Sequence, residues 1–150
     1  MTYPQAPVVE AIVAHAVPLQ FDNSKAENNR LLHSIHQIWT PDIRILHHDG
    51  FELYRWEGFL PPPEFAARTL CGFGLAYLRL KRFDRAEAVY LDVLKRFSTT
   101  YAAPEAQYYL GVVRYRRDPD SDELLAQWAG LRSRYPLSEF RVKQSFKDFP

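Results

Sequence analysis

The sequence predicts a mixed protein in which a small α/β region is followed by an all-α region, and two observations carry this prediction. Apolar and polar residues alternate on both sides of an Asp-Gly dipeptide at 49–50, which is typical of an antiparallel β-hairpin. From 64 to 148 apolar residues instead recur every three or four positions, which is typical of amphipathic helices. A chain of 150 residues is long enough for one ordinary domain or two small ones.

The amino-terminal region is expected to begin with a helix, a strand and a second helix. Segment 7–16 repeats apolar residues at every fourth position and has a proline in its first turn, which predicts a short helix. Segment 16–22 alternates apolar and polar residues, which predicts a strand. Asn23 or Ser24 is placed to cap the second helix. The buried stripe of that helix is expected to consist of Leu31, Leu32, Ile35 and Ile38.

The hairpin itself is expected over 42–57, with a two-residue turn at Asp49-Gly50. Thr40 and Pro41 stand directly in front of its first strand. Because proline lacks a backbone N–H, it belongs at the start or the edge of a strand. A proline run at 61–63 then leads into the next helix.

The all-α region is expected to contain four successive amphipathic helices and a short final one. Pro104 and Asp120 mark helix starts, Pro136 follows a helix end, and Ser138 is placed to cap the last helix. No segment after residue 64 has the alternation of a strand.

Residues 1–66 resemble the thioredoxin fold with its front end missing. In that family a Thr-Pro with a cis peptide bond precedes the hairpin, and Thr40-Pro41 stands at this place. The hairpin and the segment before it are similar to bacterial thioredoxin-like proteins. The resemblance implies an incomplete αβαββα layer in which the Thr40–Pro41 bond is a structural cis bond.

The residues that carry redox chemistry in that family are missing from this chain. A Cys-x-x-Cys pair attacks and then resolves a disulfide, whereas this chain has one cysteine, Cys71, in the helical region. We expect Cys71 to be a buried small side chain rather than a reactive thiol. The family's central strand is absent too, so strands at 17–21 and 43–47 are expected to pair directly or to be covered by a second copy, giving a possible homodimer.

The second region, 67–150, resembles tetratricopeptide repeats, which are antiparallel helical hairpins. Small residues at two positions let paired helices approach closely, and aromatic residues fill the groove beside them. The match is good in the first unit and weaker in the second, where Glu123 replaces the expected alanine. The packing positions fall on Leu70, Phe73, Gly74, Tyr77, Ala86, Tyr90, Leu110 and Gly111.

Composition narrows the classes of function. A net charge of +1 gives no electrostatic reason to expect nucleic acid as a partner, and no apolar run is long enough to predict a membrane span. A single cysteine fits a reducing compartment, so we expect a cytoplasmic protein. No phosphate-binding loop, catalytic triad or metal-ligand motif stands out, so the expectation is no cofactor, no metal and no catalytic residue.

The candidate binding residues are aromatic. Paired helices of this kind present a face on which exposed aromatic side chains can contact a peptide. The candidates are Tyr101, Tyr108, Tyr109, Tyr115 and Trp128. The alternative for these residues is a role in the core between the helices.

Three interpretations of function follow from these observations. The first is a non-catalytic module that binds another protein. The second is the carboxy-terminal portion of a thiol-disulfide oxidoreductase whose Cys-x-x-Cys lies upstream of Met1. The third is an oligomeric structural protein. The missing cysteine pair favours a protein that is not an enzyme.

Overall fold

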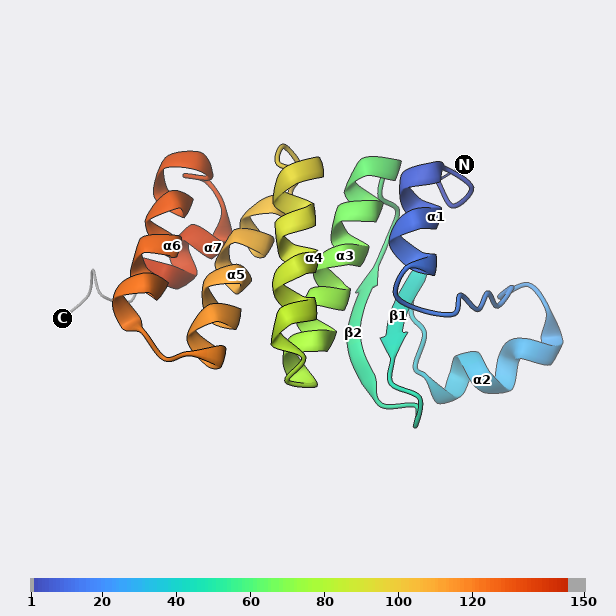
Figure 1. The fold of residues 1–150 in the computed structure, drawn as a ribbon. Coiled ribbons are helices and arrows are strands. Elements are labelled where there is room, and N and C mark those ends of the chain that lie inside the picture. Colours follow the sequence, from blue (N-terminus) through green and yellow to red (C-terminus); the bar gives the residue numbers. More distant parts are fainter. Residues whose placement is uncertain (1, 146–150) are drawn as a thin grey trace.

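The computed structural model describes residues 2–145 as a row of packed helices with a β-hairpin near its amino-terminal end (Figure 1). In that range seven α-helices and two strands follow one another in the order α1, α2, β1, β2, α3, α4, α5, α6 and α7, with a short 3-10 turn before α2. The two strands are antiparallel. The predicted class, an α/β part followed by an all-α part, is therefore confirmed at this level.

Helix α1 (Ala6–Val13) forms at the predicted place and has a proline in its first turn. Its two buried residues, Val8 and Ala11, are three apart and therefore lie on one face of the helix. Both belong to the same apolar core as Phe65 of helix α3. The periodicity of this segment thus predicted the side that packs.

The strand predicted at 16–22 is wrong, because this segment belongs to no regular element. Val17 and Leu19 expose 86% and 80% of their surface, and Phe21 exposes 51%. A strand needs a neighbour that pairs with its backbone and a face on which its apolar side chains are buried. Within the described residues the sheet consists of β1 and β2 alone, so direct pairing of 17–21 with 43–47 does not occur.

The second helix is shorter than predicted and starts later. Helix α2 (Asn29–Ser34) follows the 3-10 turn Ala26–Asn28. Ser24 does not cap it, because both its N–H and its hydroxyl donate to Asp22 Oδ1, at 2.9 and 2.7 Å. No residue of α2 is buried. The expected buried stripe is therefore wrong, since within the described residues no helix or strand packs extensively against α2. Its members are Leu31, Leu32, Ile35 and Ile38.

Strands β1 (Asp42–Leu46) and β2 (Glu52–Glu57) form the predicted hairpin. Ile43 lies opposite Trp56 and Ile45 lies opposite Tyr54. The pairing becomes irregular beyond Ile45, where Leu53 has no opposite residue in the register. Buried side chains of this hairpin face α3, because the methyl Cδ1 of Ile45 and the ring of Tyr54 both stand over Gly72.

The two ends of the hairpin differ in how well they match the prediction. The Thr40–Pro41 peptide bond is cis, as predicted. The turn is longer than the expected two residues, because the His47 N–H donates to the Phe51 carbonyl at 2.8 Å. Gly50 lies in this loop with φ of 91°, a conformation that glycine adopts without steric cost.

The remaining helices pack one after another along the row (Figure 1). Short connections place α4, α5 and α6 each antiparallel to the helix before it. Asp120 caps α6 by accepting from the N–H groups of Asp122 and Glu123, and Ser138 caps α7, both as predicted. The helices are α3 (Pro62–Arg79), α4 (Phe83–Arg96), α5 (Ala103–Arg117), α6 (Ser121–Arg134) and α7 (Glu139–Lys143).

One apolar core joins the hairpin to the helices. It contains Trp56 from β2, Phe65 from α3, Tyr90 from α4 and Ala106 from α5, each less than 9% exposed. The boundary expected between residues 66 and 67 falls inside α3, which contributes to the core on both sides of it. A separate cluster around Trp128 holds α6 and α7 together.

Candidate functional site

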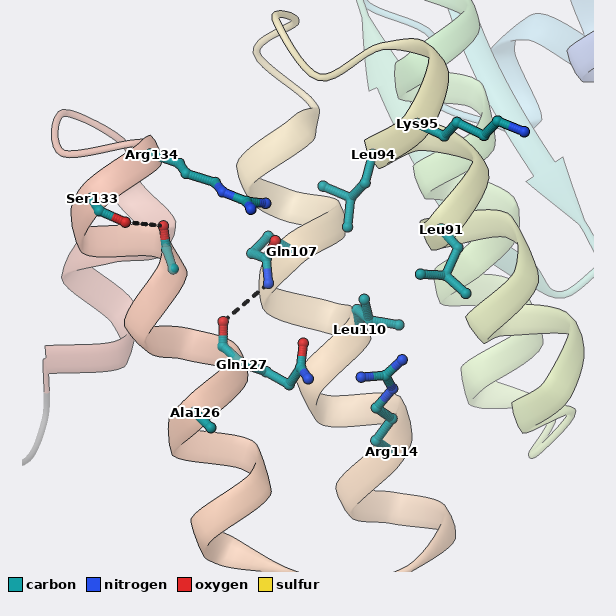
Figure 2. Close-up of a pocket in the computed structure, with 11 residues that line it drawn as sticks. Leu91, Leu94, Lys95, Gln107, Leu110, Arg114, Ala126, Gln127, Ser133 and Arg134 are labelled. Carbon is teal, nitrogen blue, oxygen red and sulfur yellow. Dashed lines mark hydrogen bonds between the residues drawn. The ribbon is translucent and has the colours of Figure 1, made fainter.

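A groove opens between α4 and α6, with α5 as its floor (Figure 2). Its volume is about 560 Å³. Side chains from all three helices line it. The lining residues are Leu91, Leu94 and Lys95 of α4, Gln107, Leu110 and Arg114 of α5, and Ala126, Gln127, Gly130, Ser133 and Arg134 of α6.

The floor of the groove is formed by buried residues of α5, one of which is hydrogen-bonded to α6. Gln107, Leu110 and Arg114 are three and four residues apart, so they share one face of α5. Leu110 is 3% exposed and Gln107 is 7% exposed. The Gln107 side-chain amide donates to the Gln127 carbonyl at 3.0 Å, which ties α5 to α6 across the groove (Figure 2).

Gly130 keeps the α6 side of the groove open. A Cβ atom at this position would lie 3.9 Å from the Gln107 side chain, an ordinary van der Waals distance. The backbone of Gly130 is not in the left-handed region, so an L-residue fits there. Glycine in the interior of a helix lowers the stability of the folded state by about 0.5–1 kcal/mol relative to alanine. Neither backbone nor packing requires glycine here, and its effect is to leave space in the groove.

Every charged residue of the lining is a cation: Lys95, Arg114 and Arg134. Arg114 is partly neutralised, because its Nε lies 2.8 Å from Glu87 and its Nη1 lies 3.7 Å from Glu123. Within residues 2–145 no carboxylate pairs with Lys95 or Arg134. The groove therefore has a floor on which Leu110 lies between the polar side chains of Gln107 and Arg114, and its lining carries positive charge and no carboxylate.

The aromatic residues predicted as binding candidates do not line this groove. The ring of Tyr108 stacks on Trp128 at 4.8 Å, and Tyr109 stacks on Tyr90 at 6.1 Å, so these rings pack between helices. Trp128 is 5% exposed. Tyr108 and Tyr109 are half-buried and Trp128 is buried, so all three rings contribute to the packing between helices.

The other two aromatic candidates lie far apart. Tyr101 is 92% exposed before the start of α5, and Tyr115 is 38% exposed in the last turn of that helix. The part of α5 from Ala103 to Tyr115 alone corresponds to about 18 Å along the axis, so the two rings cannot contact one ligand residue together.

The residues predicted at the helix-packing positions are nearly all in the interior. Gly74 lies against Tyr90, whose ring carbon Cζ would be 2.5 Å from a Cβ at residue 74. Gly111 lies against α6, where the Trp128 nitrogen would be 3.1 Å from such a Cβ. Tyr77 is only half-buried, and its hydroxyl lies 3.1 Å from His15 Nδ1. The buried members of the set are Leu70, Phe73, Gly74, Ala86, Tyr90, Leu110 and Gly111.

A buried polar cluster connects the hairpin to the helices. Glu105 of α5 is 4% exposed, accepts from the Tyr54 hydroxyl at 3.2 Å and pairs with Arg68 of α3 at 2.9 Å. Burial raises the pKa of Glu105, and the positive charge of Arg68 acts in the opposite direction. The cluster holds β2, α3 and α5 in one arrangement.

Cys71 lies beside this cluster and is fully buried, as expected for a small apolar side chain. Burial raises the pKa of the Cys71 thiol, and the nearby charge of Glu105 raises it further. The thiolate is the reactive form of cysteine, so this environment disfavours nucleophilic chemistry.

Two negative findings apply to residues 2–145. No three His, Cys, Asp or Glu side chains there lie close enough together to hold a metal ion. No helix in this range is both long enough and apolar enough to cross a membrane.

Comparisons with known proteins give no further identification. No family model matches the chain, and no curated protein or solved structure is significantly similar to it.

Sequence reasoning missed the residues that shape the groove. Leu94, Gln107 and Leu110 read as ordinary members of amphipathic helices, because a groove depends on the spacing between helices rather than on one helix. Gly130 was the available signal, since a glycine inside an otherwise helical segment has a cost that calls for a reason.

Proposed function

We propose that this protein is a non-catalytic interaction module and that its helical part docks a segment of another protein in the groove between α4 and α6. The observation that carries the proposal is the groove itself, which has a buried floor of Leu110 and Gln107 and is kept open by Gly130. Ligand sites are commonly concave and largely preformed, and their polar groups fix the orientation of the ligand.

The arrangement of α3 to α6 supports the resemblance to tetratricopeptide repeats, which we retain as a proposal. In each helical hairpin a glycine lies against an aromatic ring of the partner helix, Gly74 against Tyr90 and Gly111 against Trp128. Repeat units of this class act as scaffolds for protein binding.

The amino-terminal part is proposed as the remnant of a thioredoxin-like layer. The hairpin directly after Thr40-Pro41 supports this relationship. The irregular segment at 17–21 departs from that fold. This part contributes Trp56 to the common core, so its role in the proposal is to cover α3.

Self-association is a second candidate, favoured by the apolar surface near the amino-terminal end. Val17, Leu19, Ile38 and Trp39 are each at least 68% exposed, and β1 has one unpaired edge. Light scattering of the purified chain tests this candidate directly. A mass of one chain across a wide concentration range excludes it.

The docking proposal is tested by selecting short random peptides displayed on phage against the purified protein. The expected result is enriched peptides that bind the wild type and the Gly130→Ala variant but not Gly130→Leu, whose larger side chain fills the groove. Unchanged thermal unfolding of Gly130→Leu serves as the folding control. Peptides that bind Gly130→Leu as tightly as the wild type would place the docking site elsewhere.

A further inference from the structure

The charges and spacing of the groove also indicate which segments it accepts. We infer that the groove selects acidic segments in which carboxylates flank an apolar residue. This inference rests on the proposed function and specifies the chemical class of the partner segment.

The charged side chains that line the groove are all positive. The lining contains three cations and no carboxylate. Arg134 has no carboxylate partner in the described chain, and Figure 2 shows its guanidinium reaching from α6 toward the end of the groove near Gln107. An exposed cation without a carboxylate partner favours a ligand of opposite charge.

These charges are distributed along the groove. Arg134 lies at one end of the groove and Arg114 at the other, with Leu110 between them (Figure 2). On α5, the seven residues from Gln107 to Arg114 correspond to about 10.5 Å. An extended peptide rises about 3.3 Å per residue and its side chains share one face at every second position, so carboxylates at its first and fifth positions, with an apolar residue midway between them, match the two arginines.

The surface of the groove between the two arginines contains three leucine side chains. Leu91 and Leu94 of α4 and Leu110 of α5 present apolar atoms to the groove. Leu91 is 44% exposed, so part of this surface is free to be covered. An apolar side chain between the two carboxylates is therefore expected to occupy the middle of the groove.

Arg134 and Arg114 have unequal roles in this arrangement. The guanidinium of Arg114 already pairs with Glu87 and lies within 3.7 Å of Glu123. Reversing its charge would disturb contacts within the protein. Arg134 makes no such contact, so substitution at Arg134 tests recognition of the ligand with little effect on the fold.

The experiment uses two displayed libraries of short random peptides that are identical except for their charged residues. One library carries only Asp and Glu, and the other carries only Lys and Arg. Both are selected on the wild-type protein in parallel. Enriched peptides are then measured by fluorescence anisotropy against Arg134→Glu, Arg134→Gln, Gly130→Leu and, as a matched basic residue outside the groove, Lys81→Glu.

The expected result is enrichment from the acidic library, with an apolar residue between the acids. Binding should weaken by about tenfold in Arg134→Glu, by less in Arg134→Gln and not in Lys81→Glu. Binding should also weaken as salt concentration rises.

Two other outcomes overturn the inference. Enrichment from the basic library alone, with binding lost in Gly130→Leu, contradicts the recognition of acidic segments. It remains consistent with docking in the groove. If acidic peptides bind Arg134→Glu as tightly as they bind Lys81→Glu, the positive charge of Arg134 does not contribute to binding, and the inference is wrong. Absence of enrichment from either library contradicts the proposed function itself, so the two failures can be distinguished.

Discussion

Two glycines show how the same residue type can have opposite structural roles. At Gly74 a Cβ atom would lie 2.5 Å from the ring of Tyr90, which is itself fully buried. At Gly130 the nearest atoms would be 3.9 Å away. Gly74 is therefore required by the packing of α3 on α4, whereas Gly130 leaves open space.

The matched pair of alanine substitutions at these glycines is our first prediction. Gly74→Ala should reduce the free energy of unfolding by about 1–3 kcal/mol, because the buried ring of Tyr90 must shift. Gly130→Ala should leave it unchanged or raise it by up to about 1 kcal/mol, through better helix propensity. Urea melts monitored by circular dichroism measure both. Equal effects of the two substitutions would contradict this assignment of their contacts.

Glu105 leads to a prediction about pH. Because its pKa is raised in the folded protein, the folded state binds the proton more tightly than the unfolded state does. Its contribution to stability is complete below the unfolded value of 4.5 and is lost as pH rises through the folded value. Each unit of upward shift corresponds to about 1.4 kcal/mol.

Glu105→Gln removes this titration while keeping the shape of the side chain. The free energy of unfolding of the variant minus that of the wild type should therefore increase with pH, starting near 4.5. Urea melts at a series of pH values up to neutrality measure the difference. Taking the difference cancels the contribution of titratable groups that do not interact with Glu105. A difference that is flat or that falls with pH would contradict the raised pKa.

At the scale of elements, the sequence predicted best where local signals and packing agree. Helix caps at Asp120 and Ser138 and the hairpin at 42–57 depend on nearby residues, and the structure has all three. The predictions for 16–22 and for the buried stripe of α2 failed because an apolar pattern needs a partner surface. In these segments the described chain buries none of the apolar side chains, which are half-buried or exposed.

This difference between elements predicts where the native protein is cleaved first. The region from 14 to 41 has a helix without buried residues and is held by few tertiary contacts, so it should open locally at low cost. Trypsin should cut at Lys25 or Arg30 before it cuts within α3 to α6. Mass spectrometry of early digests identifies the sites. A first cut at Arg68 or Arg79 would show that α3 opens more readily than the amino-terminal segment.

At the scale of the whole molecule, one common core joins the two regions. Trp56 and Phe65 pack in the same cluster as Tyr90 and Ala106, so hairpin and helices bury one another. The sequence predicted the two regions from their different periodicities. It did not predict the groove, because the gap between α4 and α6 results from how three helices pack and only Gly130 marks it locally.

The central claim is that the groove between α4 and α6 docks a partner segment, and mapping of backbone amide chemical shifts tests it most directly. The most enriched peptide from the displayed libraries would be titrated into isotope-labelled wild-type protein and into Gly130→Leu. The account predicts that the largest shifts fall in 91–95, 107–114 and 126–134, and that they are lost in Gly130→Leu. Shifts confined to the hairpin or to 14–41, or shifts unchanged in Gly130→Leu, would contradict it.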